Sequence, residues 1–272
     1  MRLAPRLAGG PPVAGDRVRI DDSGTQGIVR EILPRHTVLE RIGSGGRVRA
    51  VVANADVLVV VAAVAEPPLH PRLIDSYAVA AFAGGLDFAL VLTKTDLPHD
   101  GAATQALVDR TRAAGHTVIM GSSFDPAMVE AVRGLIDGRL AALAGHSGVG
   151  KSTLTSALTG VERATGEVSD RLRSGRHTTT DPRLIPLPGG GAVIDTAGVR
   201  AFWLPPMDYT DIQAGFPDVA QAAPGCRFRT CRHMGDAGCA VEGSVDPVRL
   251  ESYRALVQAA DEASRFARGG SS

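Results

Sequence analysis

Lysine is scarce in this chain: of the 29 lysine and arginine residues among its 272 residues, only Lys94 and Lys151 are lysines. Arginine supplies the positive charge elsewhere, which indicates that these two positions need a compact ammonium group on a flexible stem. Neither sign of charge is in excess, because the formal net charge is zero. The chain as a whole is therefore not drawn to nucleic acid by its overall charge.

Long apolar runs are absent as well. The longest, at 57–64, is far shorter than the roughly 20 residues that a membrane span needs. Residues 1–12 contain two arginines but no apolar segment, so no secretory signal is visible. We expect a cytoplasmic protein without membrane contact and, since no dimer seam is evident, a monomer. In a reducing compartment its three cysteines favour metal or catalytic roles over disulfides.

The arginines are unevenly distributed. Residues 1–50 hold nine arginines against five acids, and Arg227, Arg229 and Arg232 form a second basic stretch. Two interpretations stay open. These are either solvated surfaces in an arginine-rich protein or patches that contact phosphate groups.

The central part of the chain predicts an α/β fold. From residue 55 to 196, short apolar runs alternate with helical patterns, which is typical of a mostly parallel sheet with helices on both faces. The expected strands are 57–63, 88–92, 117–120, 140–144, 183–187 and 192–194. The expected helices are 71–83, 102–114, 126–136 and 151–158. Residues 166–181 carry many charges and a threonine run, and we expect a mobile loop there.

The flanking parts differ from this centre. Short β-type runs at 17–20, 27–33, 38–41 and 48–52 predict a small β-module, similar to a partial barrel. After residue 202 come prolines, a cysteine cluster, an expected helix at 247–266 and a disordered tail at 269–272. The predicted domains are thus a β-module at 1–53, an α/β domain at 54–206 and a C-terminal module at 207–272.

A glycine-rich segment fits the pattern G-x-x-x-x-G-K-[ST] between an expected strand and an expected helix. It consists of Gly145, His146, Ser147, Gly148, Val149, Gly150, Lys151 and Ser152, with Thr153 next in the helix. Glycines in such a loop let backbone N–H groups surround phosphate oxygens at a helix N-terminus. We expect Lys151 to bridge the β and γ phosphates during hydrolysis and Ser152 to bind Mg²⁺. The strand–loop–helix context disfavours an ordinary glycine-rich turn.

Two further segments follow expected strands. In Asp195-Thr196-Ala197-Gly198, the aspartate is expected to hold Mg²⁺ through water and the Gly198 N–H to contact the γ phosphate. The run Thr93, Lys94, Thr95 and Asp96 resembles the N-K-x-D motif that reads guanine in GTPases, with threonine in place of asparagine. Asp96 would accept two hydrogen bonds that adenine lacks, so a GTP or GDP ligand is favoured. Ser122 lies where GTPases place a short base-contacting loop.

The order of these motifs is unusual. Ordinary GTPases run from the phosphate loop through D-x-x-G to the guanine motif, whereas here the guanine motif at 93–96 comes first. A circular permutation preserves the site in space, because the ends of a domain often lie close together. The chain then runs from Gly198 almost directly into the cysteine module, so loops ordered by the γ phosphate would pull on that module.

All three cysteines lie close together near the C-terminus. With His233 they form the series Cys226, Cys231, His233 and Cys239, whose spacing suits one tetrahedral structural Zn²⁺. Free thiols in a small core are the weaker alternative. A nucleophilic cysteine is weaker still, because no base pairs with one cysteine in particular.

With these motifs, the chain resembles the ribosome small-subunit-dependent GTPases, the circularly permuted bacterial family of small-subunit maturation. The resemblance covers about residues 13–260 and rests on segments 93–96, 147–152, 175–180, 195–198 and 226–241, with 32–35 and 54–56 adding to it. It implies an N-terminal OB-type barrel, a GTPase domain and a zinc module. It also implies binding to small-subunit ribosomal RNA, with hydrolysis accelerated by that partner. Because the β-module has only about 50 residues, we expect either that its barrel is incomplete or that the given start of the chain is late.

The residue that orients the attacking water is not evident from the motifs. Val199 stands where Ras-like enzymes carry a glutamine, so we expect slow intrinsic hydrolysis. His177 in the expected loop either supplies this group or is ordinary loop surface. Thr179 is our choice among three successive threonines for a Mg²⁺ ligand.

The sequence thus predicts a GTP hydrolase that acts in late maturation of the small ribosomal subunit. Two alternatives remain: an adenine-specific P-loop enzyme, and an RNA-binding zinc module with a residual nucleotide site.

Overall fold

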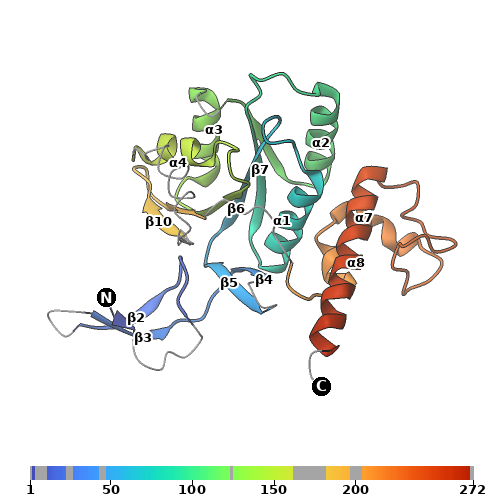
Figure 1. Cartoon of the computed structure of the whole chain (residues 1–272), viewed down its shortest axis with the longest axis horizontal. Coiled ribbons are helices and arrows are strands. Elements are labelled where there is room, and N and C mark those ends of the chain that lie inside the picture. Colours follow the sequence, from blue (N-terminus) through green and yellow to red (C-terminus); the bar gives the residue numbers. More distant parts are fainter. Residues whose placement is uncertain are drawn as a thin grey trace, which may run out of the picture.

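The computed structural model describes residues 2–3, 11–22, 27–42, 47–122, 125–161, 182–196 and 204–269, with only the backbone at 2–3, 22 and 266–269. Its centre is a six-stranded sheet in the order β10-β11-β9-β6-β7-β8 (Figure 1). The strands are β6 (Val57–Ala63), β7 (Asp87–Thr93), β8 (Thr117–Met120), β9 (Leu140–Gly145), β10 (Arg183–Pro186) and β11 (Ala192–Asp195). All neighbours pair in parallel except β10, which runs antiparallel to β11.

Helices cover both faces of this sheet, as predicted. Figure 1 shows α1 (Pro71–Ala83) and α2 (Gly101–Ala113) on one side, and α3 (Pro126–Ile136) and α4 (Lys151–Thr159) on the other. In β6, Leu58 and Val60 pack in the core with α1 and α2, whereas Val57 and Val59 pack with α3 and α4. A strand buried on both faces is apolar throughout, which is why its run was readable in the sequence. Every predicted strand and helix of this domain is confirmed to within about two residues.

The β-module contains two small sheets. In the first, β3 (Gly27–Ile32) lies between β2 (Val18–Asp22) and β1 (Arg2–Leu3). In the second, β4 (Val38–Ile42) pairs antiparallel with β5 (Val48–Ala53), and Arg41 lies directly opposite Arg49. The four β-type runs predicted here are therefore confirmed as strands, while an incomplete OB-type barrel stays a prediction.

The C-terminal module is built from α6 (Tyr209–Ala214), α7 (Pro217–Ala222), a short 3-10 turn (Ala223–Gly225) and the long helix α8 (Pro247–Gly269). Its core packs the rings of Phe216 and Tyr253 edge to face, 5.4 Å apart. The sequence did not predict α6 and α7. Within the described ranges, no helix is long and apolar enough to span a bilayer.

Helix α1 contacts both flanking modules. At its C-terminal end, Gly84 accepts a hydrogen bond from the Val38 N–H of β4 at 3.0 Å. A Cβ atom at Gly84 would lie 2.1 Å from the Val38 carbonyl oxygen, so only glycine allows this approach. Near the start of α1, Asp75 forms a buried ion pair with Arg249 of α8 at 2.7 Å. The three predicted domains therefore meet along this helix.

Candidate functional site

The phosphate loop connects β9 to α4, as the sequence predicted. A Cβ atom on Gly145 would lie 2.2 Å from the Val61 carbonyl oxygen, so no side chain fits there. Gly148 and Gly150 have φ angles of 85° and 88°, in the left-handed region that favours glycine. These turns bring the chain round to the N-terminus of α4, where free N–H groups and the helix dipole favour an anion.

The other residues of this loop differ in exposure. Ser147 is exposed, Val149 is buried, and Ser152 and Thr153 at the start of α4 are half-buried. The ring of His146 lies with its Nδ1 atom 2.8 Å from the Ser147 carbonyl oxygen. It lines a small apolar hollow between the phosphate loop and the N-terminal end of α1.

Lys151 and Asp195 meet at the start of α4. The Lys151 Nζ atom lies 2.5 Å from Asp195 Oδ1 and also donates to the Thr196 carbonyl oxygen. Both ionic side chains are more than nine-tenths buried. The structure therefore brings the phosphate-loop lysine together with the aspartate expected to serve Mg²⁺, across 44 residues of sequence.

The guanine motif lies beside the phosphate loop. Strand β6 separates β7 from β9, and its Val61 is in register with both Val91 and Gly145. The loops that follow β7 and β9 therefore begin about 10 Å apart, which is two strand spacings. Thr93 joins them, because its fully buried hydroxyl donates to the Val149 carbonyl oxygen at 2.6 Å.

The rest of the guanine motif is more open. Lys94 has a φ angle of 59° and its ammonium group donates to the Glu66 carbonyl oxygen. Thr95 is half-buried and Asp96 is exposed in the same loop. Ser122 follows β8 and is half-buried at the same edge of the sheet, since β8 runs parallel to β7.

Several predicted site residues lie outside the described parts of the chain. They are His177, Thr179 and Gly198, together with the segment 175–180. Their assigned roles stay predictions.

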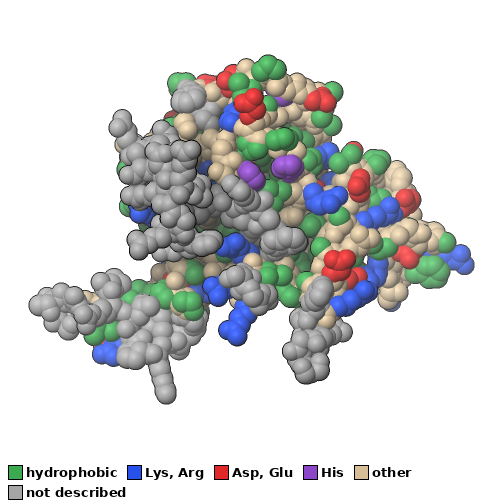
Figure 2. Space-filling model, in the orientation of Figure 1, with side chains coloured by type: hydrophobic (Ala, Val, Ile, Leu, Met, Phe, Trp, Pro, Cys, Tyr) green, Lys and Arg blue, Asp and Glu red, His purple; other side chains and the backbone are tan. Residues whose placement is uncertain are grey.

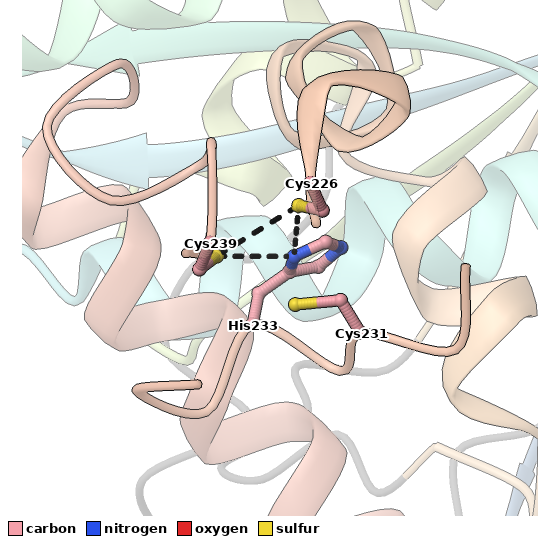
Figure 3. A group of neighbouring side chains, drawn as sticks. All are labelled: Cys226, Cys231, His233 and Cys239. Carbon is pink, nitrogen blue, oxygen red and sulfur yellow. Dashed lines mark hydrogen bonds between the residues drawn. The ribbon is translucent and has the colours of Figure 1, made fainter. Parts of the chain in front are cut away.

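The predicted zinc ligands form one cluster (Figure 3). The ligand atoms of Cys226, Cys231, His233 and Cys239 all lie within 4.8 Å of one another. The His233 Nδ1 atom is 3.6 Å from Cys226 Sγ and 3.4 Å from Cys239 Sγ, and the two sulfurs are 4.0 Å apart. Tetrahedral zinc with ordinary Zn–S and Zn–N bonds places its ligand atoms about 3.5–3.8 Å apart. The atoms of Cys226, His233 and Cys239 are therefore close to the spacing that one zinc ion requires, and Cys231 Sγ lies within 4.8 Å of them.

Neighbouring groups set the orientation and protonation of these side chains in a way that suits a metal site. The Nε2 atom of His233 lies 3.2 Å from the side-chain oxygen of Gln213 on α6, which leaves Nδ1 to face the sulfurs. Burial lowers the pKa of His233, which keeps the imidazole in the neutral form that a metal binds. The Ala240 N–H donates to Cys226 Sγ at 3.3 Å, an interaction that stabilises a thiolate.

Gln213 and Glu66 are contacts that sequence reasoning missed. Gln213 is 20 residues from His233, in a helix that was not predicted, and Glu66 contributes only its backbone oxygen. Neither has a local pattern that marks it.

Comparisons with known proteins agree with this geometry. A family model described as RsgA GTPase matches residues 32–205, more than half of the chain. Among curated proteins, "Small ribosomal subunit biogenesis GTPase RsgA" of Pseudomonas aeruginosa is 38% identical over 260 residues, which cover 92% of this chain and 76% of the relative. The protein of the same name from Chromohalobacter salexigens is 39% identical over 254 residues, covering 90% and 74%.

Two solved structures share the fold. YjeQ from Thermotoga maritima superposes with a TM-score of 0.71 at 23% identity, over 91% of this chain and 84% of that one. YloQ, described as a circularly permuted GTPase, gives 0.71 at 23%, over 94% and 83%. The strand order, the joined motifs and the sequence matches agree: the chain belongs to the RsgA GTPase family.

Proposed function

We propose that this chain is a GTPase that acts in maturation of the small ribosomal subunit and whose hydrolysis is stimulated by that subunit. One observation supports the nucleotide site above all. The Thr93 hydroxyl donates to the Val149 carbonyl oxygen at 2.6 Å and so joins the guanine motif to the phosphate loop. A base and the phosphates of one nucleotide can be held at once only if these two loops adjoin. Its relatives are named for small-subunit biogenesis, which supports the biological role.

The nucleotide would bind along the carboxyl edge of the sheet. Asp96, exposed in the loop after β7, accepts the two hydrogen bonds of the guanine edge, and Ser122 flanks the base. The glycines of the phosphate loop wrap the phosphates, as open loops of this kind do at helix N-termini. In this arrangement the base contacts the loops that follow β7 and β8, and the phosphates contact the loop that follows β9.

Binding of GTP requires Lys151 to change partner. Its ammonium group now lies against Asp195 and the Thr196 carbonyl oxygen. Phosphate oxygens would draw it to the β and γ positions, and Ser152 and Asp195 would then hold Mg²⁺, Asp195 through water. Mg²⁺ neutralises charge on the phosphates. We assign Thr179 as a further Mg²⁺ ligand and His177 as the group that orients the attacking water.

The cysteine cluster would hold one structural Zn²⁺. Zinc fixes the loops that carry its ligands and supplies folding free energy to a module with a small core. We further propose that the protein works as a cytoplasmic monomer and contacts ribosomal RNA of the small subunit.

GTP turnover with and without purified small subunits tests this proposal. We expect slow turnover alone and a clear acceleration with subunits, and an absence of acceleration would refute the role on the subunit.

Competition between GDP and ADP tests the base assignment, and tighter ADP binding would contradict the role of Asp96. His177→Ala should abolish the acceleration while leaving GDP binding intact, and an unchanged accelerated rate would remove His177 from the mechanism.

A further inference from the structure

A short loop in the C-terminal module lies between two of the zinc-ligand positions. It consists of residues 227–230, between Cys226 and Cys231, and we call it the Phe228 loop. The Cys231 N–H donates to the Phe228 carbonyl oxygen at 3.1 Å, and the Arg227 N–H donates to Gly238 at 3.0 Å. Cys226 and Cys231 of the proposed metal cluster flank the loop and these bonds hold it at both ends, so its side chains are presented from a preorganised backbone.

Phe228 is exposed on this loop. Its side chain is 52% accessible to solvent, although phenylalanine is usually buried. The guanidinium carbon of Arg227 lies 5.4 Å from the centre of its ring, within the range of a cation–π contact. Figure 2 shows hydrophobic and basic side chains together at this outer edge, over the loops that follow α7 in Figure 1. The loop therefore offers a flat aromatic surface next to positive charge.

The arginines of this loop differ from three other arginines of the module. Three arginines elsewhere in it have carboxylate partners: Arg232 with Asp261 at 2.8 Å, Arg249 with Asp75 and Asp218, and Arg254 with Glu242. In the described parts of the chain, no carboxylate lies within ion-pair distance of Arg227 or Arg229, and both are exposed. The three paired arginines are buried or half-buried, whereas the two that flank Phe228 are exposed and available to an anionic partner.

We propose that the Phe228 loop binds unpaired nucleotides of RNA, with one base stacked on the Phe228 ring and adjacent phosphates on Arg227 and Arg229. Every base has an aromatic face, and stacking on exposed aromatic side chains between basic ones is how single strands are held. An RNA duplex buries those faces, so a duplex would gain only the charge contacts. This inference deepens the proposed function and rests on it for the identity of the RNA, which is that of the small subunit.

Fluorescence anisotropy of full-length, zinc-loaded protein with a labelled single-stranded oligoadenylate of about twelve nucleotides tests the stacking, since ~4–16 nucleotides is a usual site size. We expect Phe228→Ala to weaken binding at least about five-fold and Phe228→Trp to restore it. Phe82→Ala is the matched control, because Phe82 is 56% exposed on α1, outside the module, and should bind as the native protein does. The duplex formed with oligouridylate should show no difference between native protein and Phe228→Ala.

Charge substitution gives a second test that leaves the ring and the zinc ligands intact. Arg229→Ala should lower the slope of log affinity against log salt by about 0.7, the value for one phosphate contact on a single strand. Zinc content and thermal unfolding of each variant identify any that fail to fold. If Phe228→Ala, correctly folded, binds the single strand as tightly as the native chain, the proposal is overturned.

Small-subunit binding separates this inference from the proposed function. Loss of subunit binding in Phe228→Ala with unchanged oligonucleotide binding would also overturn the inference and would indicate contact with a ribosomal protein. If small subunits do not accelerate GTP turnover by the native protein, the proposed function is refuted. Whether the loop stacks bases is decided by the oligonucleotide result alone. Basal GTP turnover should be the same in all these variants.

Discussion

Thr93 and Val149 are 56 residues apart in the chain, yet the hydroxyl of the first donates a buried hydrogen bond to the carbonyl oxygen of the second at 2.6 Å. A second oxygen, that of Ala62, lies 3.2 Å from the same hydroxyl. Threonine has one hydroxyl proton, so it can serve only one of these acceptors at a time. The much shorter contact to Val149 identifies the phosphate loop as its partner.

Thr93→Val should therefore weaken nucleotide binding. Valine has nearly the same shape but leaves the Val149 oxygen without its donor, which costs about 1–3 kcal/mol. The phosphate loop can avoid this cost by moving away from its binding conformation. We therefore expect GDP affinity to fall about 5- to 100-fold. Titration with a fluorescent GDP analogue measures the change. Thr93→Ser keeps the hydroxyl and serves as control, and equal affinities for the valine and serine variants would contradict the role of this bond.

Asp96→Asn should change the preferred base. The carboxylate accepts two N–H groups of guanine, whereas an amide offers one donor and one acceptor, which matches xanthine. Loss of charge-assisted bonds at this edge should lower GTP turnover efficiency by about a hundred-fold or more and make XTP the better substrate. Parallel turnover assays with GTP and XTP measure this exchange. If the variant still prefers GTP, Asp96 does not read the base.

Lys151→Ala should destabilise the nucleotide-free protein as well as abolish turnover. The substitution removes the ion-pair partner of a carboxylate that is 1% exposed, and breaking a buried pair costs about 3–5 kcal/mol. Urea unfolding without nucleotide measures this loss. Lys94→Ala is the matched control, because within the described residues this lysine contacts the Glu66 carbonyl oxygen and no carboxylate, so its loss should cost much less. Adding Asp195→Asn to Lys151→Ala should recover part of the stability, and a further loss would show that the pair is not the cause.

Gln213→Ala should weaken zinc binding without removing a ligand. Gln213 orients His233 through its Nε2 atom at 3.2 Å, and loss of such an orienting partner typically lowers metal affinity about 10- to 100-fold. Competition with a chromophoric chelator measures this affinity, and the native protein should release one zinc per chain. Gln221→Ala, at an exposed glutamine of α7, should have no effect. Equal zinc retention in the two variants would exclude the orienting role.

Stability should fall on acidification in a way that depends on His116. Burial, together with the charge of Arg249, lowers the pKa of His116 below its ordinary value of 6.5, so the unfolded chain binds this proton more readily. The contribution is complete above pH 6.5 and is lost as the pH falls from 6.5 toward the lower folded pKa. His116→Phe keeps the edge contact with the Phe88 ring and should flatten the unfolding free energy between pH 7 and about 5. An unchanged pH dependence of the unfolding free energy in His116→Phe would exclude His116 as its cause.

The GTPase domain was predictable from sequence because its signals are local. Strand β6 is apolar on both faces, and helices α2 and α3 are capped by the preceding Asp100 and Asp125, whose side chains accept backbone N–H groups at 3.0 and 2.9 Å. Each of these features lies within a few residues of the element that it defines. The phosphate loop and the zinc ligands are local in the same sense, since each set lies within one short stretch of sequence.

Features that depend on tertiary contact were not predictable. Helices α6 and α7 have six residues each, too few to show a helical period, and they are held by packing of Phe216 against Tyr253. The bond from Lys94 to Glu66 depends on two loops that only the folded sheet brings together. Likewise, nothing near Asp75 in the sequence indicates that its partner is Arg249, 174 residues away.

Because the strand order is permuted, the β-module and the C-terminal module connect to the sheet at different distances from the phosphate loop. The β-module is connected to the amino end of β6, from which β5 is separated by three residues. This end of β6 lies at the edge of the sheet opposite the phosphate loop. The C-terminal module follows β11, whose last residue Asp195 already contacts Lys151. Under the proposed function, exchange of GTP for GDP would therefore act close to the start of the C-terminal module and a full strand length away from the β-module, so the contacts of the two modules with the small subunit would change separately.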